Sequence, residues 1–295
     1  MIHVHQIGDI RITGLTEYIG PTHDPKVLYP DWDPAFLDRH DSWLNNDFWF
    51  KNLGRLVIGI QIWIVHAGDR VILIDTGVGN HKPRGPERMH MLNTLVPQWL
   101  AAAGASFDQV TDVVMTHLHS DHVGWNTVPD GQGGWQPAFP NARYVMPETD
   151  IAHFRALFEA APQDDPSFGD SIAPILEAGL VDFVEDGDLI AGHLRAQSAP
   201  GHTPGQTIYW IDDRAVFCAD LFHHPLQISE PHLNTAYCVL PDEARASRRA
   251  FLERAAQTGA LIFPCHFGGS HCGTIGRDGE QYSYLPADPA AAQRF

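Results

Sequence analysis

The sequence is short of basic residues. Its 295 residues include 19 Lys and Arg against 36 Asp and Glu, which gives a net charge of −17. Such a charge repels nucleic-acid phosphates and anionic membrane surfaces. No stretch approaches the apolar length that spans a bilayer, and residues 1–9 lack the basic region and apolar run of a secretory signal. We therefore expect a cytoplasmic protein with a small-molecule partner and no nucleic-acid or membrane partner.

Cysteine is scarce as well. The four cysteines, Cys218, Cys238, Cys265 and Cys272, form no Cys-x-x-Cys pair. Without a signal peptide, free thiols in a reducing cytoplasm are favoured over disulfides. Cys218 and Cys265 are expected to be small buried hydrophobic side chains.

Internal repeats, low-complexity linkers and composition shifts are also missing. The length suits one large α/β domain or two small ones, and we expect a single domain over residues 1–295. Residues 20–51 are irregular and rich in aromatic side chains. They could cover a site as a lid, pack against the core, or form the contact of a homodimer, and the sequence leaves these three interpretations open.

Hydrophobic patterns predict strands and helices in two batches. The strands expected are one or two within residues 1–20, then 56–66, 71–75, 110–115, 143–146, 181–184, 193–197, 207–211, 215–218 and 261–263. The helices expected are 91–103, 148–159, 172–180 and 241–257. Pro97 lies inside the first of these helices and could kink or restart it. Two batches of strands, each with helices, indicate sheets covered on the outside by helices.

The densest cluster of polar side chains follows the predicted strand 110–115. Within six consecutive positions lie His117, His119, Asp121 and His122. Successive side chains on an extended backbone point to opposite faces, so His117 and His119 share one face. Neutral imidazoles with a carboxylate form a ligand set suited to zinc or a neighbouring first-row metal. The pattern therefore predicts a metal site where this strand ends.

Further candidate ligands stand at the ends of later predicted strands. His202 lies in a Gly/Pro turn, Asp220 follows the strand 215–218, and His266 follows the strand 261–263. Asp75 ends the strand 71–75 in an Asp-Thr-Gly sequence that lacks the second copy an aspartic protease needs. We expect Asp75 to bond to neighbouring backbone or to a ligating histidine.

With these residues in place, the chain resembles the metallo-β-lactamase-fold hydrolases from about residue 56 to residue 266. The resemblance implies an α/β (α+β) fold, a four-layer αβ/βα sandwich with two sheets face to face. It also implies two metal ions and seven ligands: one ion on His117, His119 and His202, a second on Asp121, His122 and His266, and Asp220 bridging the two. Histidine and aspartate stand where zinc β-lactamases often carry cysteine, so the chain is most similar to the lactonase and methyl parathion hydrolase branch.

Such a ligand set predicts a particular chemistry. Two divalent ions, zinc first and Mn, Fe or Co as alternatives, can share a hydroxide that attacks an electrophilic centre. We expect this metal-bound hydroxide to open a lactone or cleave a carboxylic ester. Asp121 is a ligand and a candidate proton carrier. In the lactonases that the chain resembles, a tyrosine stands three positions after the bridging aspartate; here the residue is His223, a candidate acid for the leaving group.

Other functions stay open at this stage. A phosphotriesterase of the methyl parathion hydrolase kind would use the same ligands with a different pocket. A thioester hydrolase resembling glyoxalase II is less favoured, because no lysine occurs in the C-terminal third. A mononuclear-iron oxidoreductase resembling persulfide dioxygenases, or an inactive binding protein of the same fold, would differ in metal content or activity.

Overall fold

The computed structural model describes residues 2–269, 271–287 and 293–294. The chain splits into two compact units. Unit 1 comprises Met1–Glu17, Gln61–Ala196 and Gln293–Phe295, and unit 2 comprises Tyr18–Ile60 and Gln197–Ala292. The single domain over residues 1–295 stays a prediction.

The first large sheet contains most strands of unit 1. Its strand order is β10-β9-β6-β5-β4-β2-β1-β18, and β3 pairs with β4. The bounds are β1 Ile2–Ile7, β2 Ile10–His23, β3 Trp49–Phe50, β4 Arg55–Ala67, β5 Arg70–Ile74, β6 Asp112–Val114, β9 Arg143–Pro147, β10 Val181–Val184 and β18 Gln293–Arg294. Strands β5, β6, β9 and β10 run parallel to one another, so their carboxyl ends meet at one edge. The polar loop after β6 starts at this edge.

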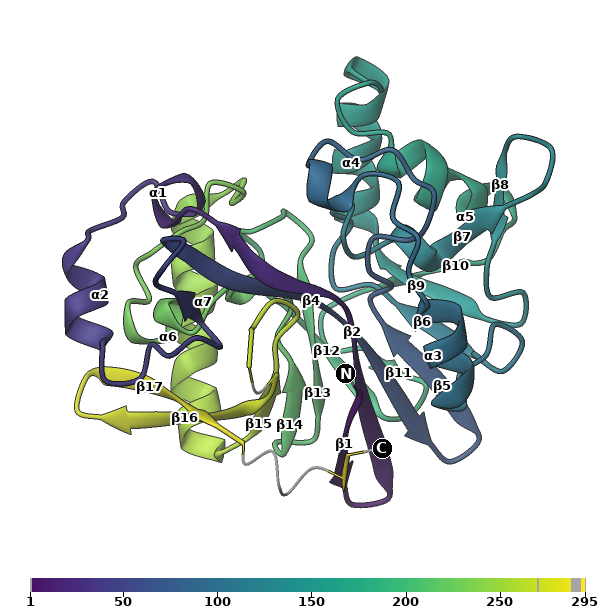
Figure 1. Ribbon diagram of the computed structural model, residues 1–295. Coiled ribbons are helices and arrows are strands. Elements are labelled where there is room, and N and C mark those ends of the chain that lie inside the picture. The colour runs from purple at the N-terminus through teal and green to yellow at the C-terminus, as the bar shows by residue number, and fades with distance from the viewer. Residues whose placement is uncertain (1, 270, 288–292, 295) are drawn as a thin grey trace. The chain divides into compact units, whose positions relative to one another are not determined.

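Helices and a small hairpin complete unit 1. They are α3 Val96–Ala102, α4 Glu148–Ala160, α5 Ala173–Glu177, the 3₁₀ turns η1 Glu87–Met89 and η2 Gly124–Asn126, the π-helix η3 Phe168–Ile172, and the strands β7 Thr127–Pro129 and β8 Trp135–Pro137. Helix α4 packs against β9 (Figure 1). The core between helices and sheet is apolar, with Leu73, Val113 and Tyr144 fully buried in it.

Two helix predictions for unit 1 had wrong bounds. The helix expected over 91–103 begins only at Val96, because Pro97 lies in its first turn, where its missing N–H costs no hydrogen bond. The helix expected over 172–180 ends at Glu177, and the π-helix Phe168–Ile172 precedes it.

The second large sheet has the order β11-β12-β13-β14-β15-β16-β17. The bounds are β11 Leu189–Ile190, β12 Leu194–Ser198, β13 Thr207–Ile211, β14 Ala215–Phe217, β15 Leu261–Phe263, β16 Gly273–Asp278 and β17 Gln281–Pro286. The helices of unit 2 are α1 Pro25–Leu28, α2 Ala35–His40, α6 Leu226–Ser229, α7 Pro241–Thr258 and the 3₁₀ turn η4 Ala219–Leu221. Helix α7 packs against β16 and ends at Gly259, whose φ of 67° is the left-handed conformation that glycine adopts readily (Figure 1).

The aromatic excursion at residues 20–51 belongs to unit 2. Tyr29, Phe36 and Phe48 are buried in its core together with Leu226 and Leu233. The rings therefore pack against the core, which is one of the three interpretations left open by the sequence. A role of this segment as a lid or a dimer contact stays a prediction.

Two further findings concern the cysteines and the helices. All four cysteines are free thiols, and Cys218 and Cys265 are buried, as predicted. Among the described residues, no helix is both long enough and apolar enough to cross a membrane.

Candidate metal centre

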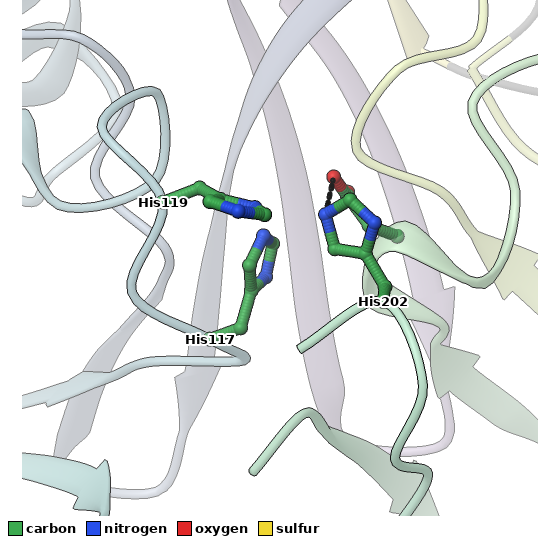
Figure 2. Close-up of side chains that lie close together, drawn as sticks. His117, His119 and His202 are labelled. Atoms are coloured by element: carbon green, nitrogen blue, oxygen red, sulfur yellow. Dashed lines mark ion pairs between the residues drawn. The ribbon is translucent and has the colours of Figure 1, made fainter. Parts of the chain in front are cut away.

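Unit 1 brings together the four predicted ligands that follow β6. The rings of His117 and His119 are 4.9 Å apart between centroids, and those of His117 and His122 are 4.0 Å apart. Figure 2 shows His117 and His119 extending from the same loop. Asp121 Oδ1 lies 3.8 Å from His122 Nε2. His117 and His122 are buried, while His119 and Asp121 are partly exposed.

Asp75 orients this loop from the end of β5. Its Oδ1 accepts a hydrogen bond from the backbone N–H of Thr116 (2.8 Å), and its Oδ2 accepts from Thr116 Oγ1 (2.7 Å) and His122 Nδ1 (2.8 Å). Because Nδ1 of His122 donates to Asp75, Nε2 is the nitrogen left to bind a metal. The bonds predicted for Asp75, to neighbouring backbone and to a histidine of this loop, are present, and the role of His122 as a metal ligand stays a prediction.

Backbone hydrogen bonds join the loop after β5 to the loop after β6. The N–H of Thr76 donates to the carbonyl of His122 (2.5 Å), and the N–H of Gly124 donates to the carbonyl of Gly77 (2.7 Å). A Cβ on Gly124 would lie 1.9 Å from the carbonyl of Val78, so only glycine allows this approach. The glycine after the ligands is therefore required by packing.

Glu17, at the unit 1 end of β2, is a supporting residue that the sequence analysis missed. Its carboxylate accepts from the N–H of Val78 (2.6 Å) and from Nε1 of Trp125 (2.7 Å), so it ties together the same two loops. The side chain is buried, and burial raises its pKa to about 7. Glu17 lies in the region predicted only as one or two strands, and no sequence motif around it indicates a supporting role.

Unit 2 contains the other three predicted ligands and gathers them around one carboxylate. Asp220 Oδ2 lies 3.2 Å from His202 Nε2 and 3.0 Å from His266 Nε2. Figure 2 shows His202 with its ion pair as a dashed line. Asp220 lies in η4, directly after β14, and His266 follows β15. His202 lies in a turn where a Cβ on Gly201 would be 2.1 Å from the backbone nitrogen of Ala244.

Neutral groups hold these predicted ligands and the neighbouring His223 in place. The N–H of Asp220 donates to Gln206 Oε1 (3.2 Å), and the N–H of His223 donates to Gln227 Oε1 (2.7 Å). His266 Nδ1 donates to the carbonyl of Gly59 (2.8 Å), so its Nε2 faces Asp220. Both glutamines are buried and were missed by the sequence analysis, because a single glutamine carries no motif.

The two adjacent histidines after η4 differ in their surroundings. His223 Nε2 lies 3.3 Å from Asp220 Oδ2. His224 is turned to the backbone: Nε2 bonds to the carbonyl of Phe48 (3.0 Å) and Nδ1 accepts from the N–H of Leu226 (3.1 Å). Burial lowers the pKa of His223 well below its usual value and lowers that of His224 to about 4. Both rings are buried, and only His223 faces Asp220.

The residues in unit 2 fit a metal ion. Donors about 2.0–2.1 Å from a tetrahedral zinc ion lie roughly 3.3 Å from one another, and the separations between Asp220 Oδ2 and the facing imidazole nitrogens are 3.0 to 3.3 Å. One ligand atom from each of Asp220, His223 and His266 lies within 4.8 Å of the others.

Comparison with known proteins agrees with this chemistry. The sequence pattern of the metallo-beta-lactamase superfamily matches residues 56–266. The chain belongs to this superfamily. It is an enzyme of the metal-dependent hydrolase type, and the predicted α+β sandwich fold class is confirmed.

Many solved structures share the fold, and three of them are described below. One is AidC, a dizinc quorum-quenching lactonase in complex with a product, at 22% identity, a TM-score of 0.77 and 97% coverage of both chains. A second is the hydrolase AbOPH of the beta lactamase superfamily, at 24% identity, a TM-score of 0.76 and 97% coverage of both chains. A third is a probable metal-dependent hydrolase from Staphylococcus aureus, at 19% identity, a TM-score of 0.76 and coverage of 96% of this chain and 99% of the other. A search of curated proteins gave no match.

Proposed function

We propose that the protein is a dinuclear metallohydrolase that opens a lactone or cleaves a carboxylic ester. The observation that carries the proposal is the arrangement around Asp220, where imidazole nitrogens converge on one buried carboxylate oxygen. Asp75 supplies a second argument, since a buried carboxylate on Nδ1 of a histidine is the usual outer partner of a metal ligand.

The proposed ligand set is the one that the sequence predicts. In unit 1 it comprises His117, His119, Asp121 and His122, and in unit 2 it comprises His202, Asp220 and His266. When bound, two divalent ions, with zinc as the first candidate, lower the pKa of water to near 7 and polarise a carbonyl oxygen. An uncharged ester or lactone suits a chain with a net charge of −17, because no basic cluster is needed to hold it.

The side chains of the protein have separate tasks in this reaction. Asp75 keeps His122 in the tautomer whose Nε2 is unprotonated and can bind a metal ion. The side chain of Asp121 is 23% exposed, which lets its carboxylate exchange a proton with solvent, in keeping with the predicted proton carrier. Leaving-group protonation by His223 is the role predicted from the sequence.

The fold neighbours support the lactone as a substrate class. AidC is described with a product, and a second neighbour, an N-acyl homoserine lactone hydrolase at 16% identity and a TM-score of 0.57, has N-hexanoyl-L-homoserine bound at its catalytic metal centre. The lactone is therefore proposed from the ligand chemistry together with what these two neighbours bind.

The test combines metal analysis with a substrate panel. Purified protein is assayed for bound metals and then for hydrolysis of N-acyl homoserine lactones, simple γ-lactones, aryl esters and an aryl phosphotriester. Two zinc-like ions per chain and faster turnover of lactones or esters are expected. One iron per chain would favour an oxidoreductase, and turnover of the phosphotriester alone would favour a phosphotriesterase. Two bound ions without hydrolysis of any substrate would overturn the proposal.

A further inference from the structure

His223 lies against the metal-binding side chains of unit 2 rather than at their margin. Its Nε2 is 3.3 Å from Asp220 Oδ2, and its ring is stacked on that of His266 with centroids 4.8 Å apart and planes 24° apart. The ring centroid of His202 is 5.0 Å away. The side chain is 7% exposed, which leaves little room for a leaving group beside Nε2.

The backbone fixes His223 in this position. Its N–H donates to Gln227 Oε1 (2.7 Å), and Gln227 is itself held by its Nε2 donating to the carbonyl of Leu233 (3.0 Å). The hydroxyl of Tyr29 donates to the same Gln227 oxygen (3.3 Å). These bonds hold the backbone of His223, and the packing of its ring against the rings of His266 and His202 restricts the orientation of the side chain.

His266 presents one ring nitrogen to Asp220. The carbonyl of Gly59 can only accept, so Nδ1 of His266 donates to it and Nε2 is the nitrogen that faces Asp220 Oδ2, at 3.0 Å. His223 Nε2 faces the same oxygen at 3.3 Å, so two imidazole nitrogens converge on one buried carboxylate oxygen.

We propose that His223 is a metal ligand, through Nε2, of the ion that Asp220 and His266 bind. These three donors all lie in unit 2, within 4.8 Å of one another. The proposal rests on the proposed metal centre and replaces the leaving-group role predicted for His223. Asp220, His223 and His266 then form a site of one carboxylate and two imidazoles, a set of donors suited to zinc, iron or manganese.

The experiment measures metal binding rather than turnover. Metal-free wild type, His223→Ala and His223→Gln are titrated with Zn²⁺ and, in parallel, with Co²⁺, whose visible spectrum reports coordination number and donors. His232→Ala serves as the matched control, because His232 is an exposed histidine of the same unit whose Nδ1 lies 3.9 Å from Glu230 rather than beside Asp220. Circular dichroism establishes that each variant is folded.

The expected result is selective loss of one ion. Removing an outer partner of a ligand costs 10- to 100-fold in metal affinity, and removing a ligand should cost at least about tenfold. Both His223 variants should therefore bind one of two ions at least about tenfold more weakly, with an altered Co²⁺ spectrum, while His232→Ala matches wild type. Unchanged affinity and spectrum in folded His223 variants, with a fall in kcat alone, would overturn the proposal in favour of the leaving-group role.

The outcomes separate this inference from the proposed function. Wild type that binds two ions and hydrolyses lactones, with His223 variants that bind metal like wild type, contradicts the inference alone. Wild type that binds two ions without hydrolysing any substrate contradicts the proposed function alone, and the titration of the variants still decides the role of His223. If His223→Ala is unfolded, the larger side chain of His223→Gln preserves packing and gives the same readout.

Discussion

The two units hold their candidate metal ligands in opposite ways. In unit 1 the candidate ligands are nearly consecutive, and buried carboxylates that are not ligands, Asp75 and Glu17, fix the loop that carries them. In unit 2 the candidate ligands come from separate segments, and neutral amides and carbonyls fix them around the carboxylate of Asp220, itself a candidate ligand. This difference indicates that candidate ligands carried by one loop need buried carboxylates to hold that loop. Candidate ligands from separate segments are positioned by the strands that they follow.

The largest effect is expected from removing the charged support in unit 1. Asp75→Ala deletes the acceptor of the Thr116 N–H, the Thr116 hydroxyl and His122 Nδ1. Breaking such a buried network costs roughly 3–5 kcal/mol, and losing the outer partner of a ligand weakens metal binding by about 10- to 100-fold. Chemical unfolding and zinc titration measure both effects.

A suitable control for Asp75→Ala is Asp108→Ala. Asp108 is an exposed carboxylate whose partner is the hydroxyl of Ser106 in its own loop. Its removal should leave zinc affinity unchanged. Equal losses of zinc affinity in the two variants would show that Asp75 acts through general charge rather than by orienting His122.

Glu17, the second charged support, should make stability depend on pH. Burial raises its pKa from 4.5 to about 7 in the folded protein, so folding favours the protonated form. Below pH 4.5 the carboxyl is protonated in both states, and Glu17 does not destabilise the folded protein. As pH rises through 7, ionisation of Glu17 lowers the free energy of unfolding by up to about 3 kcal/mol. Glu17→Gln cannot ionise, so the free-energy difference between wild type and this variant should change by about that amount between pH 4.5 and pH 8.

This comparison is made with metal-free protein by urea unfolding at each pH. The negative charge of Asp121 also raises the pKa of Glu17, and a bound ion would offset it. A difference between wild type and Glu17→Gln that does not vary with pH would show that the pKa of Glu17 is the same in the folded and the unfolded protein.

The neutral supports of unit 2 should have smaller effects. Gln206→Ala removes the acceptor of the Asp220 N–H at 3.2 Å and the amide that donates to the carbonyl of Ala199 at 3.1 Å. Leaving a buried N–H without its acceptor costs about 1–3 kcal/mol. We expect that loss of stability and about a tenfold rise in the Kd for zinc. A larger loss of zinc affinity than that of Asp75→Ala would reverse the contrast between the units.

The same contrast between the two units explains how much of the candidate site could be predicted from the sequence. The loop with His117, His119, Asp121 and His122 was found from spacing alone, and Asp75 from its place at a strand end. Glu17 and Gln206 could not be found, because their function depends on which backbone groups the fold brings to them. Pairings between distant segments leave no local pattern in one sequence. Local strand and helix positions were largely right, and the bounds near Pro97 were wrong because proline begins the helix there.

The smallest effect is expected at the outer partner of His202. Cys238 Sγ lies 4.0 Å from His202 Nδ1, whereas Asp75 Oδ2 lies 2.8 Å from His122 Nδ1. A distant thiol is a weak acceptor and orients an imidazole far less than a carboxylate does. Cys238→Ser should therefore change the Kd for zinc by less than about threefold. Removing an effective outer partner would weaken zinc binding by about 10- to 100-fold. A tenfold or larger change in this titration would show that each unit, and not unit 1 alone, relies on an outer partner to orient a ligating histidine.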